Sequence, residues 1–177
     1  GLANLGRHIE NLKKFGVPVV VAINRFTSDT SSELNAVEAY CNELGVPVSI
    51  CTHWAEGGRG AEDLAQKVVS TIDANPSQFK PLYRDEAPLL DKIETVAREI
   101  YRAERVEASD NVRAALRRME EAGYGHLPVC MAKTQYSFST NPKLVGAPEN
   151  HTLQLREVRL SAGAGFVVGI CGDIMTM

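Results

Sequence analysis

The chain has 177 residues, of which 44% are hydrophobic and 23% are charged, a composition typical of a globular protein. Its 19 basic and 22 acidic residues are interspersed and give a formal net charge of -3, so no basic run is available to neutralise a nucleic-acid backbone. The longest apolar stretch, residues 17–23, is far shorter than the roughly 20 residues that cross a bilayer. We therefore expect a cytoplasmic protein that binds neither nucleic acid nor membrane.

The first eighty residues alternate predicted helices with predicted strands. Apolar residues at helical spacing predict helices at residues 2–15, 30–44 and 60–74, and apolar runs predict strands at residues 17–23 and 46–52. Thr30 and Glu33 have the spacing of a capping box at the start of the second helix. Strands that alternate with helices predict an α/β fold with a parallel sheet, and we expect a three-layer architecture of P-loop-like type.

The remaining residues predict a second, mixed part. Two helices are expected at residues 89–100 and 109–122, followed by strands at residues 127–132, 153–161 and 166–170. We therefore divide the chain into residues 1–80, an α/β portion, and residues 81–177, a helical segment followed by a mixed-sheet subdomain. The chain starts within a helical pattern and stops just after a strand, so we expect an incomplete fragment of a larger fold.

The four cysteines, which are Cys41, Cys51, Cys130 and Cys171, are widely separated in apolar segments. They form no Cys-x-x-Cys pair, and we expect all four to be buried and reduced. The histidines are scattered without a His-x-x-x-His or Glu-x-x-His pair, so no metal site is predicted.

Ligands of open α/β sheets bind beyond the carboxyl ends of the strands, which directs attention to the loops there. Phe26 follows the first predicted strand, and Trp54, the only tryptophan, follows the second. By itself Phe26 favours a core position, but two aromatic residues at adjacent strand ends are compatible with a stacking slot for a planar heterocycle. Two separate core aromatics remain the alternative.

Several polar residues in these loops and in one other strand-end loop are further candidates for a binding site. Lys133, Thr134 and Gln135 follow a predicted strand and could bind a carboxylate or a phosphate, although a solvated loop explains them equally well. The other possible site neighbours are Asn24, Arg25, Asp29, His53 and Glu56. The chain contains no Gly-x-x-x-x-Gly-Lys-Ser/Thr motif, so it has no recognisable site for nucleotide phosphates.

Four long stretches together resemble one enzyme family. They are residues 1–26 (GLANLGRHIENLKKFGVPVVVAINRF), 52–58 (THWAEGG), 128–139 (PVCMAKTQYSFS) and 163–177 (GAGFVVGICGDIMTM). All four are similar to stretches of formate–tetrahydrofolate ligase, in the same order, so the resemblance spans the whole chain. Four ordered motifs are far more specific than a single glycine pattern.

The resemblance implies an ATP-dependent carbon–nitrogen ligase that joins formate to tetrahydrofolate and gives 10-formyltetrahydrofolate through formyl phosphate. It implies ATP, Mg²⁺ and a monovalent cation as cofactors of the parent enzyme, which tends to be a homotetramer. Phe26 and Trp54 match the two family aromatics that sandwich the folate ring, whereas no catalytic residue can be assigned.

The resemblance also implies that this chain is a carboxy-terminal half. The phosphate loop would then lie in the missing amino-terminal half of the same polypeptide, and the fragment would bind none of these cofactors tightly and be inactive alone. The alternative is a non-catalytic α/β binding or scaffold module.

Overall fold

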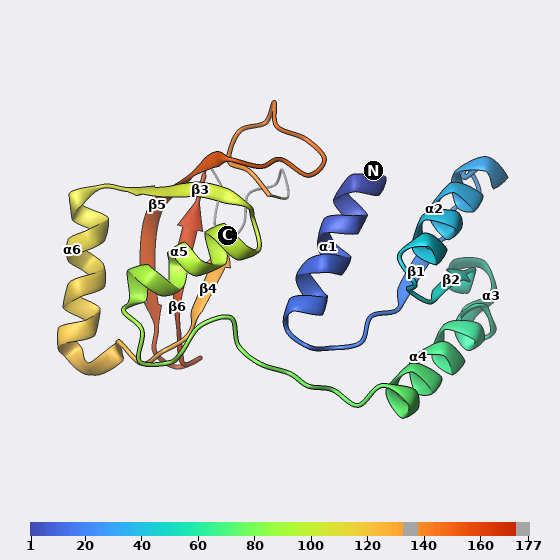
Figure 1. Cartoon of the computed structure of the whole chain (residues 1–177), viewed down its shortest axis with the longest axis horizontal. Coiled ribbons are helices and arrows are strands. Elements are labelled where there is room, and N and C mark those ends of the chain that lie inside the picture. The colour runs from blue at the N-terminus through green and yellow to red at the C-terminus, as the bar shows by residue number, and fades with distance from the viewer. Residues whose placement is uncertain (133–137, 173–177) are drawn as a thin grey trace. The chain divides into compact units, whose positions relative to one another are not determined.

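The computed structural model describes residues 1–132 and 138–172. The chain divides into two compact units, Gly1–Lys80 and Pro81–Met177 (Figure 1). Each unit contains both helices and strands, so the predicted α/β class is confirmed, with a parallel sheet in the first unit and a mixed sheet in the second. In the described ranges no helix is both long and apolar enough to span a membrane.

The first unit is built around two parallel strands. Its elements are α1 (Leu2–Lys14), β1 (Val21–Asn24), α2 (Ser31–Glu43), β2 (Val48–Cys51), the single turn α3 (His53–Glu56), a 3₁₀ turn (Gly57–Ala61) and α4 (Glu62–Ala74). The strands pair in register from Val21 opposite Val48 to Asn24 opposite Cys51, and α2 connects them. Both strands therefore end at the same edge of the sheet, where α3 begins.

Both strands are shorter than the apolar runs predicted. Pro47 immediately precedes β2, and its carbonyl oxygen accepts the 2.8 Å hydrogen bond from the N–H of Val21 at which β1 begins. Because proline has no N–H to donate, Pro18 and Pro47 limit how far the ladder extends toward the amino ends of the strands.

The predicted capping box of α2 is confirmed. The backbone N–H of Glu33 donates to Thr30 Oγ1 at 3.3 Å, and the backbone N–H of Thr30 donates to Glu33 Oε2 at 3.0 Å. Two of the N–H groups at the helix start are thereby satisfied by side chains.

The buried face of α1 differs from the predicted one. The periodicity of Leu5, Ile9 and Leu12 predicts an apolar inner face, and Ile9 is buried as predicted, but Leu12 is 46% exposed and the polar side chain of Arg7 is buried. Gly6 explains the rotation, because a Cβ atom there would lie 2.2 Å from Oη of Tyr40 in α2. The helix presents its glycine, rather than its leucines, for this close approach.

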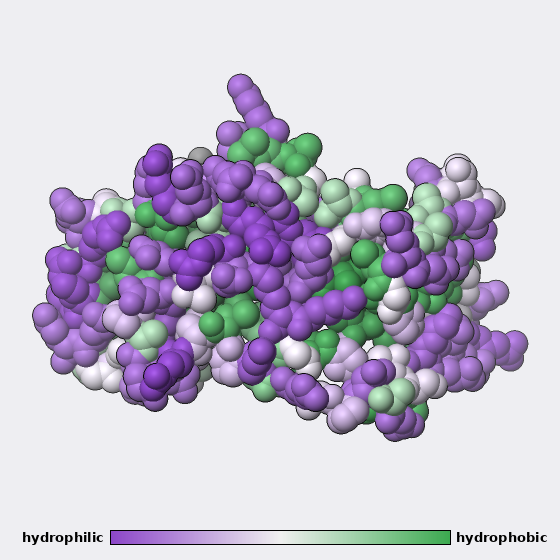
Figure 2. Space-filling view, in the orientation of Figure 1, coloured by the Kyte–Doolittle hydropathy of each residue, from purple (hydrophilic) through white to green (hydrophobic). Residues whose placement is uncertain are grey.

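Helix α4 forms within the predicted range. The helical spacing of Leu64, Val68 and Ile72 predicts the helix itself, but no residue of α4 is buried, and Val68 and Ile72 are 38% and 59% exposed. A sheet of two strands offers too little surface to cover the apolar face of this helix. Apolar surface is also visible over the region of β1 and β2 (Figure 2).

The second unit contains a four-stranded mixed sheet. Its elements are α5 (Leu89–Glu99), β3 (Ala103–Ala108), α6 (Asp110–Met119), a wide turn (Glu120–Tyr124), β4 (Val129–Ala132), β5 (His151–Ser161) and β6 (Phe166–Cys171). The strand order is β3-β5-β6-β4. The central pair, β5 and β6, is antiparallel, and each outer strand runs parallel to its neighbour.

The core of the second unit lies between this sheet and its two helices (Figure 1). Leu89 and Ile93 of α5 are fully buried, and Leu116 of α6 is 2% exposed. From the sheet side, Leu153 of β5 and Val167 of β6 complete the core. The strands expected at residues 153–161 and 166–170 agree closely with the observed β5 (His151–Ser161) and β6 (Phe166–Cys171).

Strand β3 is absent from the prediction, which expected only helices between residues 89 and 122. Its sequence, AERVEA, buries Ala103 and Val106 in the core and packs the partly buried Ala108 against it, while Glu104, Arg105 and Glu107 are exposed. This pattern suits an edge strand with one solvent-facing side, and charges on an edge strand discourage pairing with other chains.

All four cysteines are free, but one of them is not buried as expected. Cys41, Cys51 and Cys171 are buried, whereas Cys130 on β4 is exposed. Burial raises the pKa of Cys171 from 9.0 to about 12, so this thiol stays protonated in the folded chain even in moderately alkaline solution.

Candidate ligand-binding site

A pocket of about 490 Å³ lies in the first unit, at the carboxyl ends of β1 and β2. The residues that line it are Arg25, Phe26, Thr27, Thr52, Trp54, Ala55 and Glu56. Phe26 is 48% exposed and Trp54 is 70% exposed, although large aromatic side chains are normally covered. Two exposed aromatic rings on one pocket are typical of a binding site for a flat, partly apolar ligand.

The chain segment that carries Phe26 is a hydrogen-bonded turn. The backbone N–H of Arg25 donates to the carbonyl oxygen of Cys51 at 3.0 Å and so extends the β1–β2 ladder by one bond. The backbone N–H of Phe26 donates to Oδ2 of Asp29 at 2.8 Å, and the N–H of Asp29 donates to the carbonyl oxygen of Phe26 at 3.1 Å. The position of Phe26 is thus fixed from both sides.

Trp54 stands on the single turn of α3. The hydroxyl of Thr52 donates to Oε2 of Glu56 at 2.5 Å, and the N–H of Thr52 donates to the carbonyl oxygen of Gly60 at 3.0 Å. A Cβ atom at Gly60 would lie 2.4 Å from the backbone nitrogen of His53, so only glycine permits this close approach. The loop is therefore closed tightly beneath the exposed indole.

The charged residues at the pocket are Arg25 and Glu56. Glu56 receives the Thr52 hydroxyl, as described above, while the guanidinium of Arg25 is exposed and has neither a hydrogen bond nor an ion pair within the described part of the chain. A ligand here would meet two aromatic rings, one cation and one carboxylate.

The predicted site neighbours are only partly brought together. Arg25 and Glu56 line the pocket with the two aromatics, whereas Asn24, Asp29 and His53 lie beside it without lining it. The pocket is also lined by Thr27, Thr52 and Ala55, which were not predicted. Each of them is adjacent in sequence to a predicted site residue. Lys133, Thr134 and Gln135 lie outside the described residues.

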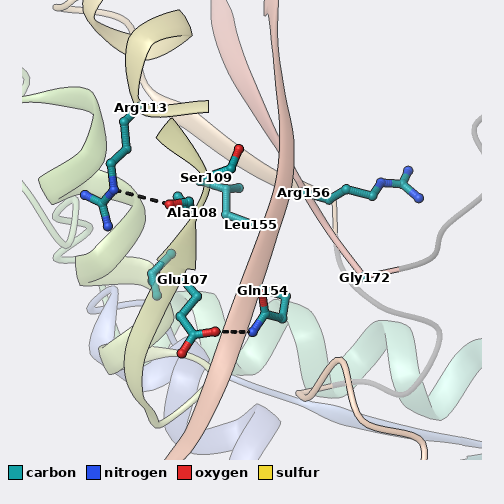
Figure 3. Close-up of a pocket in the computed structure, with 9 residues that line it drawn as sticks. Glu107, Ala108, Ser109, Arg113, Gln154, Leu155, Arg156 and Gly172 are labelled. Carbon is teal, nitrogen blue, oxygen red and sulfur yellow. Dashed lines mark hydrogen bonds between the residues drawn. The ribbon is translucent and has the colours of Figure 1, made fainter. Parts of the chain in front are cut away.

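A second pocket, of about 630 Å³, lies in the second unit where β3 ends and α6 begins (Figure 3). Nε of Arg113 donates to the carbonyl oxygen of Ala108 at 3.3 Å, and Nε2 of Gln154 donates to Glu107 at 2.5 Å. Among the described residues that line this pocket none is aromatic, and the side chains of Glu107 and Gln154 bind each other, so its chemistry does not identify a ligand.

Within residues 1–132 and 138–172, no three histidine, cysteine, aspartate or glutamate side chains are grouped so that they could hold an ion.

Comparison with known proteins identifies the family. The family model described as formate–tetrahydrofolate ligase matches residues 1–177. Proteins named formate–tetrahydrofolate ligase from Hyphomonas neptunium, Maricaulis maris and Sinorhizobium fredii are 68%, 64% and 61% identical to this chain over all of its 177 residues.

The same comparisons correct the expected extent of the fragment. The chain spans 32% of the length of each of these three relatives, which is about a third and not the half that was expected. The match does not support the expected carboxy-terminal placement. Because both the family model and these relatives match from the first residue to the last, the chain belongs to the formate–tetrahydrofolate ligase family.

Proposed function

We propose that this chain supplies the tetrahydrofolate-binding part of a formate–tetrahydrofolate ligase. The observation that carries the proposal is the pocket lined by Phe26 and Trp54, whose exposed rings suit the flat ring system of a folate. The names of the relatives supply the identity of the ligand, since tetrahydrofolate is the one substrate in them with such a ring system.

In the proposed reaction the parent enzyme uses ATP to join formate to tetrahydrofolate and releases 10-formyltetrahydrofolate, with formyl phosphate as the intermediate. ATP would donate the phosphoryl group, and Mg²⁺ and a monovalent cation would neutralise negative charge. The chain has no Gly-x-x-x-x-Gly-Lys-Ser/Thr motif, so its residues do not fit a site for nucleotide phosphates. We therefore assign these groups to other parts of the parent polypeptide, which we also propose to be a homo-oligomer.

The contribution of this chain is to bind and orient the folate. Phe26 and Trp54 would stack on the ring system, and offset stacking adds about 0.5–1.5 kcal/mol per ring pair beyond the burial of area. Arg25 and Glu56 line the same pocket and would bind polar groups of the ligand. A ring held in one orientation presents its amine to the formyl donor in one direction, which is how positioning accelerates a reaction between two bound molecules.

Fluorescence of Trp54 tests the proposal directly, because it is the only tryptophan in the chain. Tetrahydrofolate, or a stable analogue of it, should quench the emission saturably after correction for absorbance. Formate or ATP alone should not. Phe26→Ala should weaken the quenching, whereas Phe79→Ala removes an exposed aromatic outside the pocket and should not.

Two outcomes would sink the proposal. One is the absence of saturable quenching by tetrahydrofolate, and the other is an equal effect of Phe26→Ala and Phe79→Ala. The proposal also predicts that this chain alone forms no 10-formyltetrahydrofolate from ATP, formate and tetrahydrofolate, because it lacks a phosphate loop.

A further inference from the structure

Asp29 is bonded to the backbone of Phe26 at both ends of the turn between them. Its Oδ2 accepts the N–H of Phe26 at 2.8 Å, while its own N–H donates to the carbonyl oxygen of Phe26 at 3.1 Å. The first of these bonds has an ionised acceptor, and such bonds are roughly twice as strong as neutral ones. The two bonds together restrict rotation of the Phe26 backbone.

The Asp29 side chain acts on this backbone and not on the contents of the pocket. Phe26 lines the pocket, whereas Asp29 does not. Asp29 is half-buried, and its carboxylate accepts the N–H of Phe26. Any effect of Asp29 on a bound ring would therefore pass through Phe26.

A role in capping α2 is the obvious alternative, since Asp29 immediately precedes the N-cap residue Thr30. That cap is complete without Asp29. Glu33 accepts both the backbone N–H and the hydroxyl of Thr30, at 3.0 and 2.7 Å, and its own N–H donates to Thr30 Oγ1 at 3.3 Å. Within the described part of the chain, both hydrogen bonds of Asp29 are made with the backbone of Phe26.

The other aromatic residue that lines the pocket also stands on a closed turn. Trp54 stands on a turn that is closed by the bond from the Thr52 hydroxyl to Glu56 and by the close approach of Gly60 to His53. Each ring of the pocket is thus carried by a short turn with its own closing hydrogen bonds. A site that is arranged before its ligand arrives loses less conformational entropy on binding.

We propose that Asp29 is a positioning residue of the ring-binding pocket, whose carboxylate fixes the backbone of Phe26 so that the aromatic ring stays at the pocket when no ligand is bound. The inference rests on the proposed function, because the ligand used to test it is tetrahydrofolate. It assigns to Asp29 a contribution to affinity without contact with the ligand.

The test compares three variants by quenching of Trp54 fluorescence. Asp29→Ala removes the acceptor, and we expect the dissociation constant for tetrahydrofolate to rise about fivefold, the size of effect that loss of a carboxylate-to-backbone hydrogen bond has at helix caps. Asp29→Asn retains an oxygen that can accept the Phe26 N–H but carries no charge, so it should recover part of the affinity that Asp29→Ala loses. Glu33→Ala, the matched control, removes the α2 cap and should lower the melting temperature without changing affinity.

A second measurement reads the hydrogen bond itself. In the chain without ligand, the amide proton of Phe26 should exchange with solvent faster in Asp29→Ala than in Asp29→Asn while the other protected amides of the unit are unchanged, because a general loss of stability would accelerate them all. The inference is wrong if Asp29→Ala binds tetrahydrofolate normally, if Asp29→Asn recovers none of the affinity, or if Glu33→Ala weakens binding equally. Failure of the proposed function looks different, because the unchanged chain would then show no saturable quenching at all.

Discussion

The ammonium nitrogen of Lys92 lies 5.8 Å from the centre of the Tyr83 ring, inside the second unit. The Lys92 side chain is completely buried, and it donates hydrogen bonds of 2.6, 2.8 and 2.9 Å to the carbonyl oxygens of Asp85, Gly125 and Leu127. The Lys92 side chain of α5 therefore connects two segments: the one that precedes α5 and the one that lies between α6 and β4. Burial of this kind is tolerated because all three ammonium protons are used.

Replacement of Lys92 by Met should destabilise the second unit severely. The methionine fills a similar volume but leaves three carbonyl groups without their donor, and each buried unsatisfied group costs about 1–3 kcal/mol, so we expect a loss of about 3 kcal/mol or more. Urea denaturation followed by circular dichroism measures the change. Lys143→Met, at an exposed lysine of the same unit, should change stability by less than about 0.5 kcal/mol, and equal effects would show that the buried bonds contribute little.

Gly60→Ala should disturb the loop that carries Trp54. The added Cβ atom would lie 2.4 Å from both His53 N and the carbonyl carbon of Thr52, so the backbone must shift, at a cost of about 1–3 kcal/mol. We expect a lower melting temperature together with weaker quenching of Trp54 by tetrahydrofolate. Gly58→Ala is the matched control, because a Cβ atom there has nothing within 4 Å, and a loss of binding in that variant as well would argue against a specific effect at Gly60.

The buried thiol of Cys171 predicts a loss of stability in alkaline solution. Burial raises its pKa from the ordinary 9.0 to about 12, so between these pH values the unfolded chain has released a proton that the folded chain retains. The stabilising contribution is complete below pH 9 and is lost as the pH rises toward 12. Cys171→Ala should make the free energy of unfolding depend less steeply on pH in this window, and an unchanged slope would contradict the assignment. Tyr101, whose pKa burial also raises, should account for part of the slope that remains.

In the full-length ligase, Trp54→Ala should weaken tetrahydrofolate binding by about 1–3 kcal/mol, the range known for stacking of bases on aromatic side chains. Formation of the proposed formyl phosphate intermediate should persist, because that step would not require the folate ring. The Michaelis constant for tetrahydrofolate and an assay of formyl phosphate formation separate the two steps. Phe26→Ala should act in the same way, and normal Michaelis constants in both variants would exclude the rings from the site.

The sequence predicts a local structural feature correctly where that feature depends only on residues close together in the chain. The capping box of Thr30 and Glu33 and the alternation in β5 are of this kind, since a few side chains decide each of them. Strand β3 was missed because its register and burial depend on β5, more than forty positions later in the chain. The buried face of α1 was predicted correctly only at Ile9 for a similar reason, because the contact between Gly6 and Tyr40 has no local signature.

In the candidate site, too, some features are predictable from the sequence and others depend on the folded backbone. Phe26 and Trp54 could be paired from sequence, because parallel strands place their carboxyl ends at one edge of a sheet. The contact of Asp29 with the Phe26 N–H and the close approach at Gly60 depend on backbone geometry, which residue types alone do not specify. The folate-binding role of the two rings stays a prediction.

The sheet of the second unit has a consequence for the order of its assembly. Its two central strands, β5 and β6, are joined by the short turn at residues 162–165, so they can pair by closing a loop of four residues. The outer strands precede this hairpin in the chain, and β3 reaches its partner only after a much longer loop has closed. We expect the β5–β6 hairpin to form the folding nucleus and the two edges to join it later, so that destabilising substitutions in the hairpin mainly slow folding while those in β3 mainly accelerate unfolding.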